Sequence, residues 1–140
     1  MNELRSKLGG ILKRSGYSVT RPRWEVFQFL SGKEPVSVSS ITKALEKSID
    51  RASVYRTVNL FQELGIVQRH NVGWKYKIEL SDAFSEHHHH LTCIRCGKIT
   101  MVHEKSLELS MKNTARWYGY QMTGHQVELQ GYCEDCEKKP

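Results

Sequence analysis

Four stretches in the first 65 residues carry apolar side chains at intervals of three and four, the period of an amphipathic helix. They lie at residues 4–12, 26–30, 41–45 and 51–64. A glycine follows three of them, and a short polar residue that can cap a helix precedes three. The glycines are Gly16, Gly32 and Gly65, and the caps are Thr20 (with Pro22 just inside the helix), either Ser37 or Ser39, and Asp50. The pattern predicts four helices.

A strand-like pattern replaces the helical one after residue 65. Residues 66–70 and 74–79 are rich in β-branched and aromatic side chains, and residues 71–73 between them end in Gly73. This arrangement predicts a β-hairpin. Three helices followed by a hairpin form a winged helix-turn-helix, in which the last helix, residues 51–64, enters the major groove of DNA. We therefore expect a DNA-binding domain at residues 1–80.

The remaining residues predict a second, smaller domain of mixed structure. A polar segment at residues 81–86 suits a hinge, and residues 87–140 follow it. In that last segment we expect strands at 88–93 and 99–102, a helix at 107–118 and a strand at 120–129. Alternation of His125, Val127 and Leu129 with polar residues predicts one covered face on that strand. An exposed strand edge and the aromatic residues Trp117 and Tyr118 on the helix are typical of a dimerisation domain. The fold class is therefore α+β.

Charge is distributed unequally between these two parts. Residues 1–80 contain 14 Lys and Arg against 7 Asp and Glu, whereas residues 81–140 contain 7 against 8. The cationic first part is suited to nucleic acid. With four cysteines, no signal peptide and no long apolar run, we expect a cytoplasmic protein with reduced thiols and no membrane segment.

Basic and polar residues on the predicted reading helix suit major-groove contacts. They lie away from the apolar face formed by Val54, Val58, Phe61 and Leu64. A solvated helix surface is the simpler interpretation of this helix alone, but the hairpin and the charge asymmetry favour DNA. The candidate DNA-binding residues are Arg51, Ser53, Tyr55, Arg56 and Asn59 on the helix, Arg21 and Arg23 for the flanking backbone, and Lys75 and Lys77 on the wing.

The four cysteines form two Cys-x-x-Cys pairs, Cys93/Cys96 and Cys133/Cys136. Two residues between thiolates allow both to bind one metal ion, and four thiolates complete a closed structural Zn²⁺ site. A redox-active pair is the alternative. It would need one pair at a helix N-terminus.

Four consecutive histidines, residues 87–90, precede the first of these pairs. Because successive side chains of a strand point to opposite faces, His87 and His89 face one way while His88 and His90 face the other. Glu108 and His125 are the best candidates to join the first two, and Glu79 to join the second two. The alternatives are a solvated loop or an affinity tag, although an internal run that continues into a metal-type cysteine pair is no ordinary tag.

Several of these motifs occur together, and in the same order, in one known family. They are Thr20-Arg21-Pro22-Arg23, residues 52–59 (ASVYRTVN), Glu79-Leu80, residues 87–98 (HHHHLTCIRCGK) and Thr123-Gly124-His125 with the following Cys133. Over residues 19–136 the chain resembles the ferric uptake regulator (Fur) family of metal-dependent bacterial transcription regulators.

The resemblance implies a homodimer that binds a palindromic DNA operator and takes no small-molecule substrate. It implies structural zinc at Cys93, Cys96, Cys133 and Cys136, a site in the dimerisation domain at His87, His89, Glu108 and His125, and a regulatory hinge site at Glu79, His88 and His90, for Fe²⁺, Zn²⁺ or Mn²⁺. The chain departs from the family where iron-type members have a further histidine, because Pro35 stands there, and Met101 replaces a common acidic residue. His70, His103 or water could complete the hinge site.

The leading hypothesis is therefore a metal-responsive repressor that controls iron or zinc uptake and is not an enzyme. Metal at the hinge would fix the angle between the two reading helices of the dimer. The alternative within the family is a peroxide sensor that oxidises a histidine ligand of bound iron. A metal-dependent hydrolase or a metal-storage protein would leave the winged helix unexplained.

Overall fold

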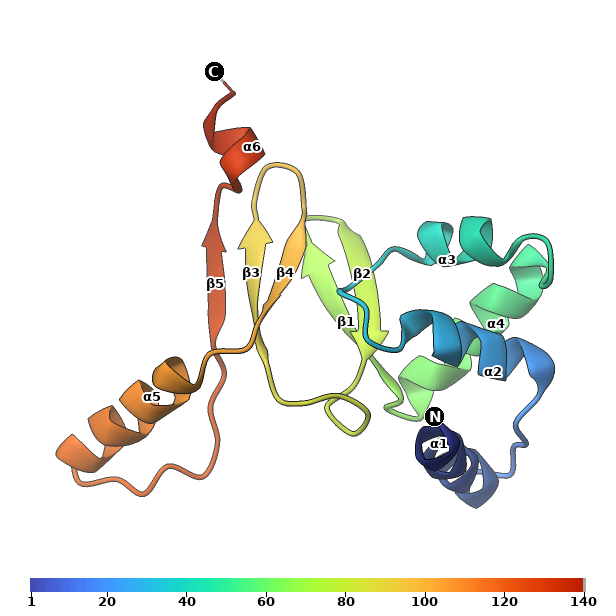
Figure 1. Cartoon of the computed structure of the whole chain (residues 1–140), viewed down its shortest axis with the longest axis horizontal. Coiled ribbons are helices and arrows are strands. Elements are labelled where there is room, and N and C mark those ends of the chain that lie inside the picture. Colours follow the sequence, from blue (N-terminus) through green and yellow to red (C-terminus); the bar gives the residue numbers. More distant parts are fainter. Residues whose placement is uncertain (140) are drawn as a thin grey trace. The chain divides into compact units, whose positions relative to one another are not determined.

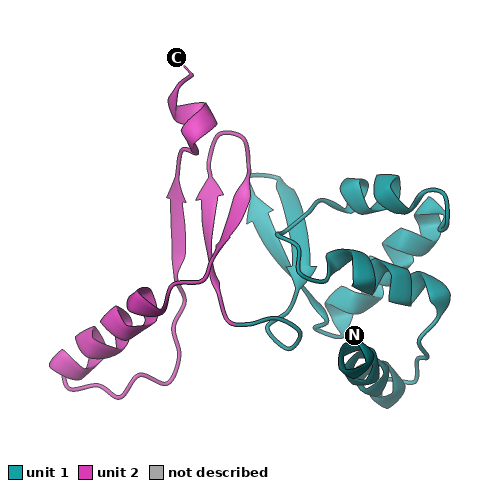
Figure 2. Ribbon diagram, viewed as in Figure 1, with its two compact units in different colours: residues 1–86 teal, residues 87–140 magenta. Residues whose placement is uncertain are grey.

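The structure is a computed structural model that describes residues 1–139, and it divides into two compact units. Unit 1 is Met1–Glu86 and unit 2 is His87–Pro140 (Figure 2). Each contains helices and a small sheet, so the predicted α+β class is confirmed. None of the helices within residues 1–139 is long and apolar enough to cross a membrane.

Unit 1 begins with four helices (Figure 1). They are α1 (Asn2–Arg14), α2 (Arg21–Leu30), α3 (Val38–Leu45) and α4 (Arg51–Glu63). The side chains of Thr20, Ser37 and Asp50 cap α2, α3 and α4 by accepting hydrogen bonds from backbone N–H groups of the first turn. Ser37 rather than Ser39 is therefore the cap of α3.

A hairpin of β1 (Val67–Val72) and β2 (Lys75–Leu80) completes the winged helix-turn-helix. In its two-residue turn, Gly73 has a φ of 63°, a backbone conformation that residues with a side chain rarely adopt. Trp74, which we expected in the strand, lies in this turn and is 97% exposed. The sequence pattern also missed an isolated β-bridge, in which Val36, before α3, pairs with Ile78 of the wing.

The hydrophobic core of the described residues lies entirely in unit 1. Helix α4 contributes Val54, Val58, Leu60 and Phe61, together with the buried hydroxyl-bearing Thr57. Other members are Leu8 and Leu12 of α1, Val26, Phe27 and Leu30 of α2, Val38 and Ile41 of α3, and Ile66, Val67, Ile78 and Leu80 around the wing. Since the core spans all four helices and both strands, the wing is fixed to the helices by packing.

The segment 81–86, which the sequence suggested as a hinge, is anchored to unit 1. Phe84 packs edge-on against Phe27, with 5.0 Å between ring centroids, and the Ser81 N–H donates to the Ile66 carbonyl. From α1, the Lys7 ammonium donates to the Ala83 carbonyl. The chain is therefore held against the winged helix as far as Phe84.

Unit 2 is a three-stranded sheet with two helices (Figure 1). Its elements are β3 (His89–Cys93), β4 (Ile99–Val102), α5 (Lys105–Trp117), β5 (Glu128–Gly131) and α6 (Glu134–Glu137). The order is β4-β3-β5, with β4 antiparallel and β5 parallel to the central strand. Helix α6, which follows Cys133 directly, was not predicted.

The prediction of a strand at 120–129 was wrong. Only Glu128–Gly131 forms a strand, because β3 offers just His90–Cys93 as partners in the parallel register. All four residues of β5 are exposed, but just before it the predicted alternation is seen, since His125 and Val127 are half-buried and Gln126 between them is exposed. One of the alternating residues before β5, His125, contacts Glu108 on α5.

Candidate metal centres and nucleic-acid surface

The four cysteines of unit 2 gather at one point. Cys93 ends β3, Cys96 follows in the turn, and Cys133 and Cys136 flank the start of α6. All four are free thiols whose sulfur atoms lie within 4.8 Å of one another. The Cys96 and Cys133 Sγ atoms are 3.8 Å apart. Tetrahedral zinc with Zn–S bonds of about 2.3 Å has a ligand-to-ligand edge of about 3.8 Å, so the spacing fits that metal and excludes a disulfide.

Hydrogen bonds and burial shift the pKa values of Cys93 and Cys136 in opposite directions. Backbone N–H groups of Cys96 and Cys133 lower the pKa of Cys93 to about 5, and the Cys133 N–H lies 3.3 Å from its sulfur. Burial, followed by the neighbouring sulfurs, raises the pKa of Cys136 to about 12. Of these two thiols, Cys93 is the easier to ionise, and a metal ion bound by all four sulfurs would have to displace the proton of Cys136.

Arg95 holds the two cysteine pairs together, a role that sequence reasoning missed. Its guanidinium donates to the Cys136 carbonyl at 2.8 Å and the Lys139 carbonyl at 3.3 Å. It also lies over the Tyr132 ring, 4.9 Å from the centroid. A basic residue between the cysteines of one pair was the only available signal, because its carbonyl partners are 41 and 44 residues away.

A second cluster brings together His87, His89, Glu108 and His125. The His87 Nε2 lies 3.1 Å from Glu108 Oε1 and 3.0 Å from His125 Nε2, and His125 Nε2 lies 3.2 Å from the same carboxylate oxygen. The His89 Nε2 contacts that oxygen as well. These spacings approach the edge of about 3.3 Å expected for a tetrahedral ion bound by nitrogen and oxygen at about 2.0–2.1 Å.

The fold explains how these four donors converge. His87 and His89 lie on the same face of the chain leading into β3, and their rings meet edge-on with centroids 4.8 Å apart. Glu108 comes from the first turn of α5, and its pKa is lowered by the hydrogen bond to His89 and by the neighbouring imidazoles. Three imidazoles and one carboxylate form a donor set suited to Zn²⁺ or Fe²⁺.

On the wing of unit 1, Glu79 is surrounded by two further polar side chains. Only 2% of Glu79 is exposed, although it is a carboxylate. Its Oε1 accepts a hydrogen bond of 2.8 Å from Gln68 Nε2 and lies 2.6 Å from His70 Nε2. Gln68 and His70 are on β1, and Glu79 is on β2.

The other two histidines of the run lie together in unit 2. His88 is buried, His90 is half-buried, and their ring centroids are 4.8 Å apart. The ring of His103, which follows β4, is 5.4 Å from that of His88. His103 itself is exposed.

The outer surface of α4 presents the candidate nucleic-acid contacts. Arg51, Arg56 and Asn59 are exposed, whereas Ser53 and Tyr55 are half-buried. Asp50 accepts a hydrogen bond from the Ser53 hydroxyl at 2.6 Å, and the Arg56 guanidinium donates to that hydroxyl at 3.3 Å. The hydrogen bonds from the Ser53 hydroxyl and from the Ser53 N–H lower the pKa of Asp50, and the nearby positive charge of Arg56 has a smaller effect in the same direction.

A pocket of about 310 Å³ lies between α4 and the start of α2. It is lined by Thr20, Pro22, Arg23, Ser53, Arg56 and Thr57. Two arginines from different helices and the N-terminal end of α2 thus face one polar hollow, an arrangement suited to an anionic oxygen.

The side chains of the other candidate DNA contacts differ in their exposure and in their partners within the protein. Arg21 is tied to Glu25 by a salt bridge of 2.7 Å, although it remains 74% exposed. The Arg23 guanidinium donates to the Ser18 carbonyl at 2.7 Å and lies over the Tyr17 ring. On the wing, Lys75 is exposed beside the turn and Lys77 is half-buried.

Comparison with known proteins places this arrangement in a family. Residues 14–130 match the model of the ferric uptake regulator family. The ferric uptake regulation protein of Klebsiella pneumoniae is 37% identical over 137 residues, which cover 91% of this chain and 86% of the relative. That of Escherichia coli strain K12 is 36% identical over 137 residues, covering 91% and 90%.

Solved structures agree. The Vibrio cholerae ferric uptake regulator is 34% identical, with a TM-score of 0.63 over 87% of this chain and 96% of that one. The Helicobacter pylori regulator, 22% identical, shares the fold with a TM-score of 0.78 over 99% of this chain and 94% of that one. The chain therefore belongs to the ferric uptake regulator family, and it is a metal-responsive transcription regulator rather than an enzyme.

Proposed function

We propose that this regulator is a cytoplasmic homodimer that binds palindromic DNA operators and represses genes of iron or zinc uptake when metal occupies its hinge. The observation that carries the proposal is the buried carboxylate of Glu79 on the wing of the DNA-binding unit. A buried carboxylate is stabilised by donors such as Gln68 and His70, which lie beside Glu79, and by a bound cation. A metal bound there would act directly on the element that contacts DNA.

The reading surface in this proposal is the exposed side of α4. Arg51, Arg56 and Asn59 would reach base edges or phosphates in the major groove. The pocket between Arg23 and Arg56 would hold a backbone phosphate, because two guanidinium groups and a helix N-terminus favour an anion. Lys75 and Lys77 on the wing, with Arg21, Ser53 and Tyr55, would make the flanking contacts.

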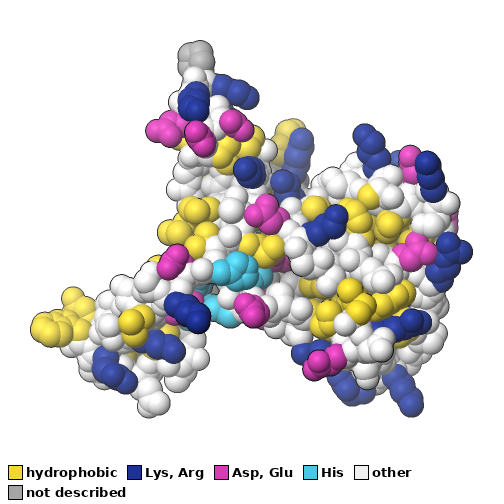
Figure 3. Space-filling view, in the orientation of Figure 1, with side chains coloured by type: hydrophobic (Ala, Val, Ile, Leu, Met, Phe, Trp, Pro, Cys, Tyr) yellow, Lys and Arg dark blue, Asp and Glu magenta, His cyan; other side chains and the backbone are white. Residues whose placement is uncertain are grey.

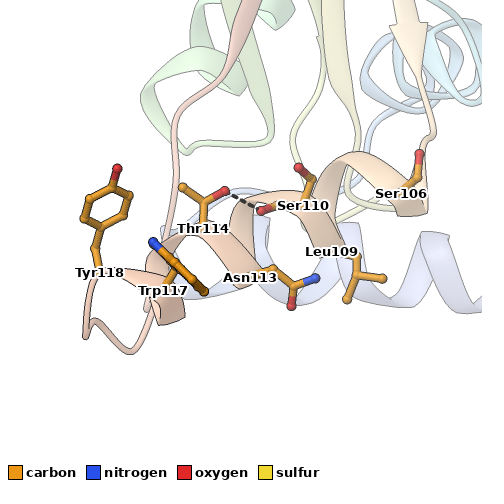
Figure 4. A pocket seen from close by; sticks show the side chains of 7 residues that line it. All are labelled: Ser106, Leu109, Ser110, Asn113, Thr114, Trp117 and Tyr118. Carbon is orange, nitrogen blue, oxygen red and sulfur yellow. Dashed lines mark hydrogen bonds between the residues drawn. The ribbon is translucent and has the colours of Figure 1, made fainter.

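The second copy of the chain would cover unit 2. Helix α5 has no buried residue, and Leu109 and Trp117 are 59% and 86% exposed. With Asn113, they project from one side of α5 into a hollow of about 580 Å³ (Figure 4). Figure 3 shows hydrophobic side chains gathered at the end of this helix. The open edge of β5 could also pair with its copy. A single unit this small needs such a partner to bury its apolar surface.

The three metal sites would have different functions. Zinc at Cys93, Cys96, Cys133 and Cys136 would be structural, since four thiolates leave no open position. The cluster of His87, His89, Glu108 and His125 would bind a second ion within unit 2 and fix α5 to the sheet. Fe²⁺, Zn²⁺ or Mn²⁺ would join Glu79 to His88 and His90 as the regulatory ion.

The hinge ion would couple metal to DNA through the angle between the two units. Glu79 belongs to the wing, whereas His88 and His90 belong to unit 2, so one ion bound by all three would restrict that angle. In a dimer, the angle sets the distance between the two α4 helices and thus the half-site spacing that fits. Metal and DNA would then each raise the affinity for the other.

A DNA-binding titration with two variants tests the reading surface. Replacing Arg56 by Ala removes an exposed cation from α4, and Lys138→Ala removes the same charge from an exposed position after α6. On an operator-containing duplex measured by fluorescence anisotropy with metal present, we expect Arg56→Ala to weaken binding by roughly 1–3 kcal/mol and Lys138→Ala to leave it unchanged. Equal binding by both variants would remove α4 from the interface.

A further inference from the structure

The tip of the wing carries a tryptophan, Trp74, whose side chain the protein leaves uncovered. It is 97% exposed, more than any other large apolar residue among residues 1–139. Tryptophan side chains are highly buried on average, and they are enriched at interfaces, where the ring is covered and the indole N–H has a partner. A single exposed apolar residue also occurs without a partner, so the structure and the charge around Trp74 have to decide.

A tight turn presents this ring at the end of the hairpin. Val72 and Lys75 form the last pair of the ladder, so only Gly73 and Trp74 make up the turn. The φ of Gly73 is 63°, whereas that of Trp74 is negative, a combination typical of a type II′ turn. Because this turn matches the twist of the two strands, Trp74 has a defined position on the hairpin.

The base of the wing is fixed to the rest of unit 1. Val36, before α3, and Ile78, on β2, exchange two backbone hydrogen bonds of 2.9 and 2.8 Å. Ile78 and Val67, one on each strand, belong to the same buried cluster as Val58 and Phe61 of α4. A duplex bound by α4 would therefore meet the wing in a defined position.

The charge of the wing suits a polyanionic partner. Between Glu63 and Glu79 the chain has three Lys and Arg residues and no Asp or Glu. They are the exposed Arg69 and Lys75 and the half-buried Lys77. Contacts with phosphates position a protein on DNA, whereas contacts with base edges in the grooves read the sequence. The cations of the wing can make the first kind of contact, and Trp74 is available for the second.

We propose that Trp74 enters the minor groove of the operator, beside the major groove that α4 occupies, and that its indole N–H reads A·T base pairs there. The proposal rests on the DNA binding proposed above and adds a base contact to it. Tryptophan has one N–H donor and no acceptor. In the minor groove an A·T pair presents only acceptors, adenine N3 and thymine O2, whereas a G·C pair adds the amino group of guanine, which is a donor. The indole N–H therefore matches A·T pairs and is opposed by G·C pairs.

An anionic lipid surface is the competing partner, because an aromatic ring beside lysines also suits the headgroup region of a membrane. The position of the ring favours DNA. Trp74 lies in the same unit as α4, on which Arg51, Arg56 and Asn59 are exposed.

A series of operator duplexes tests the contact, with the metal-loaded, full-length chain and fluorescence anisotropy as readout. Outward from the half-site, each position carries in turn A·T, G·C or inosine·C. Inosine lacks the amino group of guanine, so its pair with cytosine resembles G·C in the major groove and A·T in the minor groove. At the position that Trp74 contacts, we expect the parent to bind the A·T and inosine·C duplexes equally and the G·C duplex roughly 2–12-fold more weakly, the range of one neutral hydrogen bond.

Three variants separate the indole from its surroundings. Trp74→Ala should bind all three duplexes equally. Trp74→Phe keeps an aromatic ring but has no N–H, so it should also lose the preference while it binds more tightly than Trp74→Ala. The matched control Lys75→Ala removes a neighbouring charge and should weaken binding to all three duplexes by a similar factor, with the preference kept. Thermal unfolding verifies that the variants are folded.

Retention of the A·T preference in Trp74→Ala, or no preference in the parent, would overturn the minor-groove contact. The fluorescence difference between the parent and Trp74→Phe isolates the signal of Trp74. Protection of this signal from acrylamide by phosphatidylserine vesicles, and not by the operator duplex, would overturn the proposal in favour of a lipid surface. Weaker binding by Arg56→Ala in the same assay would leave the proposed function standing in each of these cases. If Arg56→Ala and Trp74→Ala both bind as the parent does, the reading surface itself is refuted, and the contact of Trp74 with it.

Discussion

The two units of this chain both combine helices with a small sheet, but they differ in the interactions that can stabilise them. Among residues 1–139, the clustered apolar core belongs wholly to unit 1. In unit 2, by contrast, the buried apolar residues are Cys93, Ile99 and Cys136, and two of these are candidate metal ligands. Helix α5, with 13 residues, buries none.

This difference shows what each unit requires in order to fold. Unit 1 can fold by burying Phe27, Phe61 and their neighbours, as an ordinary small domain does. Unit 2 has its polar ligands inside and its large apolar residues, such as Trp117, outside. We therefore expect its stability to depend on bound metal and on a partner subunit.

Removing the zinc should have the largest effect. Structural zinc contributes apparent binding free energies of about 10–16 kcal/mol in small domains. We therefore expect strong chelation, or Cys136→Ser, to unfold unit 2 and leave unit 1 folded. Two-dimensional NMR of backbone amides can follow both units in one sample. Dispersed signals from β3 and β4 after complete zinc removal would contradict the comparison.

A core mutation should have the reverse selectivity. Phe61 is fully buried on α4, so Phe61→Ala should lower the free energy of unfolding of unit 1 by about 3–5 kcal/mol. Zinc affinity should not change. Urea unfolding with simultaneous zinc-release measurements checks both, and Trp74→Ala, at a position 97% exposed, is the neutral control. Zinc loss in parallel with the unfolding of unit 1 would show that the units are not independent.

Zinc affinity should fall as pH falls, because protons compete for the thiolates. Cys136, with its pKa raised to about 12, must release a proton on binding at any pH from 6 to 8, whereas Cys93, at about 5, is already ionised. At least one proton is released, so the affinity should drop by roughly tenfold or more per pH unit. Competition with a chelator of known pH dependence measures this. A flat profile would contradict the assignment of Cys136 as a ligand.

The smallest effect concerns a helix cap in unit 1. The Ser37 hydroxyl accepts a hydrogen bond of 3.1 Å from the Ser40 N–H, so Ser37→Ala should destabilise unit 1 by about 1 kcal/mol. Ser39→Ala, two residues later and inside α3, is the matched control and should have almost no effect. Thermal unfolding of zinc-loaded protein is sufficient, and equal shifts for both variants would refute the cap.

Sequence reasoning located the elements of unit 1 well because local signals define them. Thr20, Asp50 and Gly65 mark helix boundaries through side-chain hydrogen bonds or a positive φ, which are properties of a few neighbouring residues. It failed for residues 120–127, where period-two alternation imitated a strand. In that segment His125 lies in the cluster with His87, His89 and Glu108 and is not part of a paired strand.

The candidate sites were foreseeable in their ligand types but not in their surroundings. Cysteine spacing and strand alternation indicated which donors belong together. Contacts between distant residues left no such pattern, among them the link from Arg95 to Cys136 and the bridge from Val36 to Ile78. The position of His70 beside Glu79 depends on the hairpin register, which is set by the two-residue turn at Gly73 and Trp74, whereas the sequence pattern placed the turn at residues 71–73.

Operator affinity of the zinc-loaded protein with and without a second metal tests the central claim most directly. Titration of one labelled duplex by fluorescence anisotropy, for the parent chain and Glu79→Gln, gives both values. We predict that Fe²⁺, Zn²⁺ or Mn²⁺ tightens binding by the parent roughly 5–150-fold, the usual range of such coupling, and does not tighten binding by Glu79→Gln. Equal operator affinity of the parent with and without the second metal would contradict it.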